Sequence, residues 1–402
     1  MSLSRRIAAT AVAAAVSLLI SACGSVSGHP AAGEIDVRKL DVGSYSTDPN
    51  DMRYNYYPGL SSGKHLAIMR LADKVVNGLD IDPKLKYSAA GRLAELSDAP
   101  SFFQDHFSAA ATQYGLLYGF SVSSSDHDEV DFAKAGDTYA SVLVMQYPDE
   151  ASAAAAAQAF ETIDFDVAKD QNQSVQLAKY PAARSHWRPG IRTLGSWLAR
   201  GSYVVNIFAR TPRTELPDLT ALTEHIYDVQ LPPLDSLKPL TKREILHLPM
   251  DPDDILRRIF TKNELSTYSP FVPITMSVTS HAFLAFAGGD TSATKSDLEA
   301  SGIDVAGVVD KSVVLRARDA AAAQDYVAKK RQKTARPVDG PADVPDVLCA
   351  EDPDSEKNTT FNDNRFRCMV HYGRYIARVN SSQLADAQQR AAAQYAQLAN
   401  SW

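Results

Sequence analysis

The clearest catalytic pattern in the chain is Gly59-Leu-Ser61-Ser-Gly63, which has the G-x-S-x-G form in which serine hydrolases hold their nucleophile. Such an elbow needs a buried strand before the serine and a helix after it. A helix is expected after Ser61, but the preceding DMRYNYYP ends in Pro58 and contains no aliphatic run. We therefore favour a turn that starts a helix, and a hydrolase that uses Ser61 is the alternative.

Metal-ligating residues show no pattern that predicts a metal site. The nine histidines are scattered and none belongs to an H-E-x-x-H frame. Four acidic residues have the offsets of a calcium-binding loop, but Lys357 stands where that loop requires glycine. They are Asp352, Asp354, Glu356 and Asp363. We interpret them as a solvated acidic loop, and we expect no metal, no cofactor and no catalytic group.

One aromatic group could form a binding surface. His186-Trp187-Arg188 comes just before a predicted hairpin that contains Trp197 and Tyr203. Cations beside aromatic rings can bind ligands, but partly buried hairpin aromatics are the preferred interpretation. No ligand-binding residue is assigned.

Cys23 has the best-supported chemistry. Arg5 and Arg6 precede 14 uncharged residues, Ile7 to Ile20, which is shorter than the roughly 20 residues that span a bilayer. The following Ile20-Ser21-Ala22-Cys23 resembles a bacterial lipobox. It predicts cleavage before Cys23 and attachment of two or three acyl chains, such as palmitate, which together anchor a protein stably. Ser4-Arg5-Arg6 leaves the export route open.

The composition indicates a folded, acidic protein after cleavage. The remaining 380 residues hold 39 basic and 48 acidic side chains, a net charge of −9. This balance argues against nucleic acid as a partner. We expect membrane contact through the lipid on Cys23, on the outer face of the cell membrane. An envelope lipid, a small molecule or a protein is the expected partner.

Cys349 and Cys368 are the other two cysteines, and in an exported protein they are expected to form a disulfide. The 18 residues between them are polar and rich in turn formers. Closing such a loop stabilises a fold by about 3 kcal/mol in the chain-entropy model. A redox role is less favoured because the pair is not a C-x-x-C motif.

The elements that must position these residues occur in two similar sets. A strand is followed by Asp149 or Asp319, each placed to cap an alanine-rich helix. A hairpin whose second strand begins near Tyr203 or Tyr375 follows, and a helix closes each set. Each hairpin should pair with the strand before the alanine-rich helix. We interpret 124–232 and 290–402 as a duplicated helix-strand-helix-hairpin-helix unit.

The fold class that follows is α+β, with two related units and antiparallel or mixed sheets. The expected parts are a signal peptide (1–22), a tether (23–33), an N-terminal domain (34–232) and a C-terminal domain with the disulfide (233–402). A cleft between the two units is a candidate ligand site.

Several connecting elements are also predicted. We expect a helix capped by Ser62 that ends at Asn77-Gly78, and a linker that begins PPLDSLKPL at residue 232. A short helix in DPDDILRRIF and strands in ITMSV and SHAFLAF should follow.

The segments GEIDVRKLDVGSY, RLADKVVNGLDIDPKL, SHAFLAF, LEASGIDVAG and VVLRARDAAAA resemble a family of lipoproteins from mycobacteria, nocardiae and other actinobacteria that is classed as a domain of unknown function. The similarity covers nearly all of the mature chain. It implies lipidation, export and a two-part architecture, and it assigns no functional residue. The mixed α+β style is also loosely similar to the extracellular sensor domain of some mycobacterial kinases.

These observations predict a lipid-anchored extracytoplasmic protein that binds a ligand or partner and has no catalytic activity. The alternatives are an envelope serine hydrolase that uses Ser61, a solute-binding receptor of an importer, and a structural assembly factor.

Overall fold

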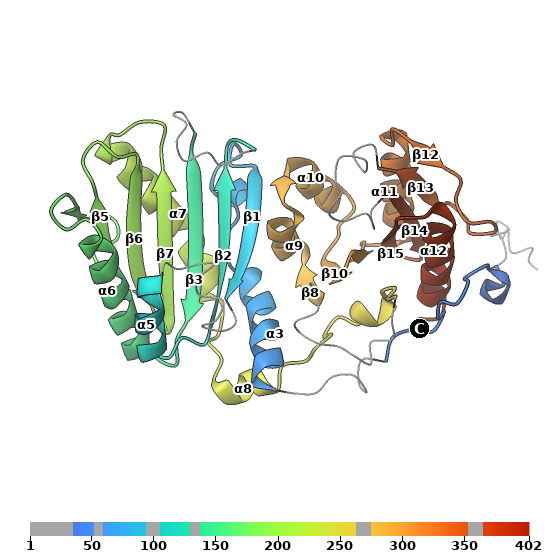
Figure 1. The fold of residues 1–402 in the computed structure, drawn as a ribbon, viewed down its shortest axis with the longest axis horizontal. Coiled ribbons are helices and arrows are strands. Elements are labelled where there is room, and N and C mark those ends of the chain that lie inside the picture. The colour runs from blue at the N-terminus through green and yellow to red at the C-terminus, as the bar shows by residue number, and fades with distance from the viewer. Residues whose placement is uncertain are drawn as a thin grey trace, which may run out of the picture. The chain divides into compact units, whose positions relative to one another are not determined.

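The computed structural model describes residues 35–51, 59–93, 105–128, 137–262, 275–352 and 365–401. This part of the chain has the predicted α+β fold, and the pairings within its two sheets are antiparallel (Figure 1). It contains no helix that is long and apolar enough to cross a membrane.

The first sheet has the strand order β4-β5-β6-β7-β3-β2-β1-β9. Its strands are β1 (Tyr87–Leu93), β2 (Tyr118–Ser125), β3 (Tyr139–Gln146), β4 (Gln173–Val175), β5 (Arg184–Trp187), β6 (Thr193–Arg200), β7 (Tyr203–Arg210) and β9 (Gly289–Asp290). Because side chains alternate along a strand, β3 contributes Leu143 and Met145 to one face and Val142 and Val144 to the other.

Helices cover both faces of the first sheet. They and the short helices nearby are α3 (Leu60–Ala72), α4 (Gly78–Ile81), α5 (Asp105–Gln113), α6 (Glu150–Asp166), α7 (Leu216–Asp235) and α8 (Lys242–Leu246). The 3₁₀ helix η1 (Val37–Lys39) instead lies beside α12 (Leu384–Ala399). Phe107 of α5 and Phe160 of α6 pack with Trp197 on one face. Ile68 of α3 and Ile226 of α7 belong to the core on the other face.

The second sheet has the strand order β12-β13-β14-β15-β11-β10-β8. Its strands are β8 (Thr275–Thr279), β10 (Val305–Val309), β11 (Ser312–Arg316), β12 (Pro337–Val338), β13 (Leu348–Glu351), β14 (Phe366–Tyr372) and β15 (Tyr375–Ser381). The helical segments of this half are η3 (Leu256–Arg258), α9 (Ser280–Ala287), α10 (Ser292–Ala300), α11 (Ala320–Gln332) and α12 (Leu384–Ala399).

The two sheets repeat one arrangement. In each, a hairpin (β2–β3 or β10–β11) leads to an alanine-rich helix (α6 or α11), then to a second hairpin (β6–β7 or β14–β15) and a final helix (α7 or α12). The second hairpin pairs with the strand before the alanine-rich helix, through β3–β7 and β11–β15, as predicted. The structure adds β2 and β10 to the unit that the sequence indicated.

The turns and caps of the repeat follow the sequence. Asp149 accepts a hydrogen bond from the Ser152 amide at 2.7 Å, and Asp319 accepts one from the Ala322 amide at 2.8 Å. Each therefore satisfies a free N–H at the start of its helix. Gly201 and Gly373 open the two-residue hairpin loops with φ of +54° and +51°, a conformation that glycine adopts without strain.

Two predicted elements are wrong. SHAFLAF forms α9, not a strand, because Thr279 accepts a hydrogen bond from the Ala282 amide and starts a helix there. A short apolar run alone does not distinguish the two structures. The segment from Asp251 forms only the 3₁₀ turn η3, because the Asp251 carboxylate accepts hydrogen bonds from the amides of Ile255 and Arg257.

The predicted helix caps and linker also differ. Helix α3 begins at Leu60 without a side-chain cap, so Ser62 lies inside it, and Asn77 starts α4 instead of ending α3. The expected linker begins as the last turn of α7, which continues through two prolines to Asp235. Buried leucines hold this segment against the core: Leu231, Leu234, Leu237 and Leu240.

Two buried glutamines fix the chain where it enters each repeat. The Gln230 amide on α7 accepts from the Val76 N–H at 3.0 Å and donates to the Lys74 carbonyl at 2.8 Å. Gln394 on α12 accepts from the Phe260 N–H and donates to the Arg258 carbonyl, both at 2.7 Å. Residues 37–402 form one compact unit, and the domain boundary at residues 232 and 233 stays a prediction.

Candidate functional site

A half-buried histidine–aspartate pair lies where α4 meets α9. The Nε2 atom of His281 is 2.8 Å from Oδ2 of Asp80, and their side chains are 34% and 22% exposed. Asn77 Nδ2 lies 3.3 Å from the same imidazole nitrogen. The two partners are 201 residues apart in the sequence, so only the fold brings them together.

Local helix capping positions both sides of the pair. Asn77 accepts a hydrogen bond from the Leu79 amide at 3.0 Å, and Asp80 accepts one from the Asn77 amide at 2.9 Å. This reciprocal capping box holds the Asp80 carboxylate in place. On the other side, Thr279 caps α9 and donates its hydroxyl proton to Asp73, the residue after α3. The Asp80 carboxylate and the His281 imidazole are therefore each held in the first turn of a capped helix, α4 and α9.

Electrostatics favour the charged form of the pair. Burial acts against protonation of His281, but the hydrogen bond to Asp80 and the charges of Asp80 and Asp73 outweigh it and raise the His281 pKa. Burial also opposes ionisation of Asp80, yet the hydrogen bond with His281 and its charge leave the Asp80 pKa below its ordinary value. A proton on this imidazole is thus held more tightly than on a free histidine.

In the described part of the chain, this pair hydrogen-bonds no side chain that could serve as a nucleophile. Among the described residues, Asp80 and Asn77 are the ones that hydrogen-bond His281, and its buried Nδ1 bonds to none. A catalytic base instead needs a nucleophile within hydrogen-bond reach. The pair therefore joins α4, before the first sheet, to α9, which follows strand β8 of the second sheet.

Other contacts strengthen the same junction. Strand β9 adds to the edge of the first sheet beside β1, and Lys86 forms an ion pair with Asp290 at 2.7 Å. The Thr291 amide and hydroxyl both donate to the Lys86 carbonyl at 2.9 Å. The chain after α9 is thus fixed to a sheet that is built almost entirely from residues before 211.

The residues singled out in the sequence lie apart from this junction pair. Ser61 lies in the first turn of α3 and is half-buried. The segment in which its preceding strand would lie, 52–58, is outside the described residues. Sequence reasoning missed the junction because nothing in the chain links His281 to Asp80, although the Asn77-x-x-Asp80 spacing is a readable capping signal.

The aromatic group is packed, as the preferred interpretation held. Trp197 and Tyr203 are both 3% exposed. Trp197 lies against Phe160 with ring centres 4.9 Å apart, and the Trp187 indole donates to the Ile191 carbonyl at 2.8 Å. His186 lies 3.0 Å from Glu161, with both side chains 12% exposed. These side chains are therefore structural parts of strands β5, β6 and β7.

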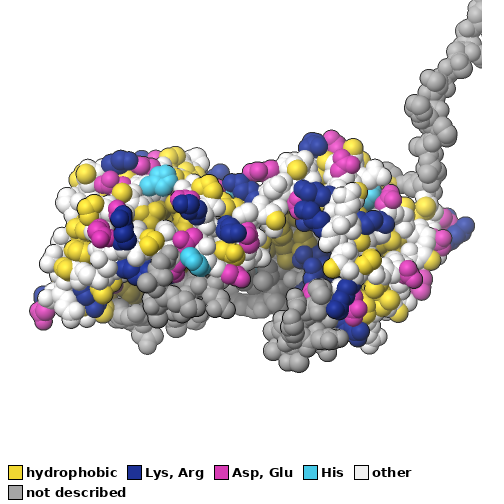
Figure 2. Space-filling view, turned by 90° about the horizontal axis from the view of Figure 1, so that it is seen from above, with side chains coloured by type: hydrophobic (Ala, Val, Ile, Leu, Met, Phe, Trp, Pro, Cys, Tyr) yellow, Lys and Arg dark blue, Asp and Glu magenta, His cyan; other side chains and the backbone are white. Residues whose placement is uncertain are grey.

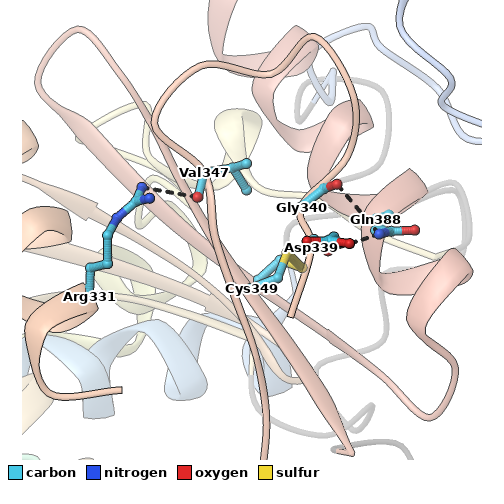
Figure 3. The surroundings of a disulfide bond; sticks show 7 residues. Arg331, Asp339, Gly340, Val347, Cys349 and Gln388 are labelled. Atoms are coloured by element: carbon cyan, nitrogen blue, oxygen red, sulfur yellow. Dashed lines mark hydrogen bonds between the residues drawn. A yellow bond between two sulfur atoms is a disulfide. The ribbon is translucent and has the colours of Figure 1, made fainter. Parts of the chain in front are cut away.

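The predicted disulfide is present between Cys349 and Cys368. The two residues are direct partners in the β13–β14 pairing, and they are 2% and 0% exposed. Figure 3 shows the bond beneath the chain that connects β12 to β13, where Gln388 of α12 donates to the Asp339 carbonyl at 2.8 Å. Burial inside the sheet makes this a structural bridge.

Other predicted positions fall outside the described residues, namely Cys23, Asp354, Glu356 and Asp363. Asp352 is described, and it accepts a hydrogen bond from Arg367 at 2.7 Å. Within the described ranges, no group of three histidine, cysteine or acidic side chains is arranged to hold a metal ion.

Comparison with known proteins identifies two family matches. Residues 54–250 match the N-terminal part of a domain of unknown function (DUF7373), and residues 255–401 match its C-terminal part. No curated protein matches the chain. A solved structure with weak similarity is the extracellular domain of PknH from Mycobacterium tuberculosis. It is 10% identical with a TM-score of 0.29, over 40% of this chain and 94% of that one.

Proposed function

The chain belongs to the DUF7373 family, and from this premise we propose that it is a lipid-anchored binding or interaction protein of the cell envelope without catalytic activity. The observation that carries the proposal is Ile20-Ser21-Ala22-Cys23 at the end of a 14-residue uncharged run. The buried Cys349–Cys368 bridge supports export, because disulfides persist in oxidising compartments.

The experiment for the anchor is metabolic labelling of the full chain with alkyne-palmitate in a bacterial host that processes lipoproteins. Cys23→Ser should lose the label and retain the signal peptide, whereas Ser25→Ala, two residues away, should keep both label and processing. Mass spectrometry should place a diacylated cysteine at the mature N-terminus. An unlabelled wild-type chain would refute the anchor.

A binding role without catalysis is supported by the contacts of the two described side-chain clusters. Among the residues that the structure describes, no nucleophile hydrogen-bonds the His281–Asp80 pair, and the aromatic group around Trp197 is packed inside the fold. A thermal-shift screen of the purified chain against envelope lipids, glycans and metabolites tests this role. If neither this screen nor cross-linking in the cell envelope finds a ligand or partner, the binding role is wrong.

The serine hydrolase alternative has a separate test. A fluorophosphonate should label the wild-type chain and leave Ser61→Ala unlabelled if Ser61 is a nucleophile. The importer-receptor alternative receives less support, because such receptors alternate parallel strands with helices and the described strand pairings are antiparallel.

A further inference from the structure

Arg378 occupies a central position in the second sheet that is unusual for an arginine. It lies on β15 directly between Val313 of β11 and Met369 of β14, and Val313 is 6% exposed. Its half-buried side chain therefore leaves the backbone among apolar neighbours. A charged group is costly to hold in such a place unless it is paired.

No pairing partner is present among the described residues. The Nε of Arg378 is buried without a hydrogen-bond acceptor, and no described carboxylate lies within 4.0 Å of the guanidinium. Two other buried arginines are paired with carboxylates: Arg210 with Asp137, and Arg316 with both Asp304 and Asp253. The Nε atoms of Arg188, Arg257 and Arg258 are, like that of Arg378, buried without an acceptor among the described residues. Burial, followed by the charge of Arg367, lowers the pKa of Arg378.

Arg378 interacts with Tyr326 of α11, which lies beside Lys330 and is also influenced by the Asp297 carboxylate. Tyr326 and Lys330 lie one turn apart on α11 and are within electrostatic range of each other, with the Lys330 ammonium 5.1 Å from the Tyr326 ring centre. Arg378 interacts with the Tyr326 side chain as well. Burial raises the pKa of Tyr326, so its hydroxyl keeps its proton. Lys330 is bonded to Asp297 at 2.6 Å and retains further N–H donors.

The repeat shows that the fold does not require this arginine. By register, the first sheet has Asn206 at the same position, between Leu143 of β3 and Trp197 of β6. The Asn206 amide donates to the Ser196 carbonyl at 3.1 Å and is satisfied. Counting from the capping aspartates, Phe160 stands where Lys330 does, and it stacks on Trp197. Between the alanine-rich helix and the sheet, the first copy therefore has the rings of Phe160 and Trp197, whereas the second copy has the cations Lys330 and Arg378.

We propose that Arg378, Tyr326 and Lys330 bind the phosphate group of a ligand. A guanidinium pairs with phosphate through two parallel hydrogen bonds. The donors come from two elements, strand β15 and helix α11, and a phosphate group offers more acceptor oxygens to them than a carboxylate does. Figure 2 shows Lys and Arg side chains gathered over the part of the surface where α10 and α11 lie in Figure 1, which favours the approach of an anion.

This site gives the proposed binding protein a ligand class, and it rests on that binding role but not on the lipid at Cys23. The test is calorimetric titration of the full chain in a nonionic detergent. Inorganic phosphate and glycerol 3-phosphate represent soluble ligands, and a short-chain phosphatidylglycerol below its micelle concentration represents a lipid headgroup. If the soluble phosphates bind more tightly, the natural ligand is a soluble phosphate compound. If phosphatidylglycerol binds more tightly, the natural ligand is a phospholipid.

Two variants make the test sharp. Arg378→Met should weaken binding by about tenfold or more, because it removes a charge-assisted contact. Arg374→Met, in the hairpin loop that precedes the same strand, should bind like the wild type. Arg378→Met should also melt at a higher temperature than the wild type without ligand, because an unpaired buried charge is removed. An arginine with only a structural role would lower the melting temperature instead.

Three outcomes overturn the site: no phosphate compound binds, Arg378→Met binds as well as the wild type, or acetate competes as well as phosphate. A failed site leaves the lipid-labelling result of the proposed function intact, so the two failures are distinguishable.

Discussion

The His281–Asp80 pair offers a prediction whose size can be worked from the structure. Asp80→Ala removes the acceptor of the Asn77 amide, a cap worth about 1 kcal/mol. It also removes the bond to His281, and hydrogen bonds to charged groups contribute about 1.5–3 kcal/mol. Since the His281 side chain is 34% exposed, the lower part of that range applies, and the total loss should be about 2–3 kcal/mol.

Asp80→Asn separates the two contributions. The asparagine oxygen can still accept from the Asn77 amide, so the cap is kept and only the charge is lost. The expected loss is about 1–2 kcal/mol, smaller than for Asp80→Ala. Adding His281→Gln completes a double-mutant cycle that isolates the coupling between the two side chains.

The coupling should depend on pH with a defined sign. The folded-state pKa of His281 is raised, so its contribution is complete below the unfolded value of about 6.5 and is lost as the pH rises through the folded value. The pKa of Asp80 is lowered, so its contribution is present above about 3.9 and is lost as the pH falls through its folded value. The coupling is therefore largest between about pH 4 and 6.5.

Urea unfolding followed by tryptophan fluorescence measures these free energies for each variant at about pH 6 and about pH 9. The reasoning is refuted if the cycle gives the same coupling at both values, or if Asp80→Asn and Asp80→Ala lose equal stability.

Three further substitutions test interactions that stabilise the fold. Replacing Cys349 and Cys368 together by serine should cost about 3 kcal/mol, measured by urea unfolding against a chemically reduced wild-type control. Gln230→Met should cost about 2–4 kcal/mol, because it leaves the Val76 N–H and the Lys74 carbonyl buried without partners, whereas Gln176→Met on the surface should be neutral in the same assay. Asp319→Ala should cost about 1 kcal/mol in thermal unfolding by removing a helix cap, and Asp319→Asn should recover most of it.

The sequence predicted the parts of the fold that local signals specify. Asp149 and Asp319 are strong capping residues before alanine-rich runs, and Gly201 and Gly373 mark hairpin loops, so the repeat could be recognised despite weak identity. SHAFLAF could not be assigned, because a run of five apolar residues fits a helix or a strand, and the deciding contact is the Thr279 cap outside the run.

The candidate site could not be predicted for a different reason. His281 and Asp80 lie in separate family halves, and the capping signal Asn77-x-x-Asp80 predicts a helix start but not a histidine partner. Their pairing depends on where α9 packs against the first sheet, a tertiary contact that no local pattern encodes. Arg378 had no signal in the sequence either, because an arginine in a strand normally points to solvent; only the register with Val313 and Met369 shows that it lies at the centre of a sheet.

The stabilising features of the fold occur in both copies of the repeat, whereas Arg378 has no arginine counterpart in the first copy. Both copies need a capped helix, a glycine hairpin loop and a glutamine that fixes the entering chain, so these features are present in both. The repeated fold does not require an arginine at the position of Arg378. In the first copy, Asn206 occupies the equivalent position and its side-chain amide makes a hydrogen bond. A buried cation without a partner destabilises the copy that carries it. The proposed phosphate ligand would supply the missing anion, and calorimetry on Arg378→Met tests this account.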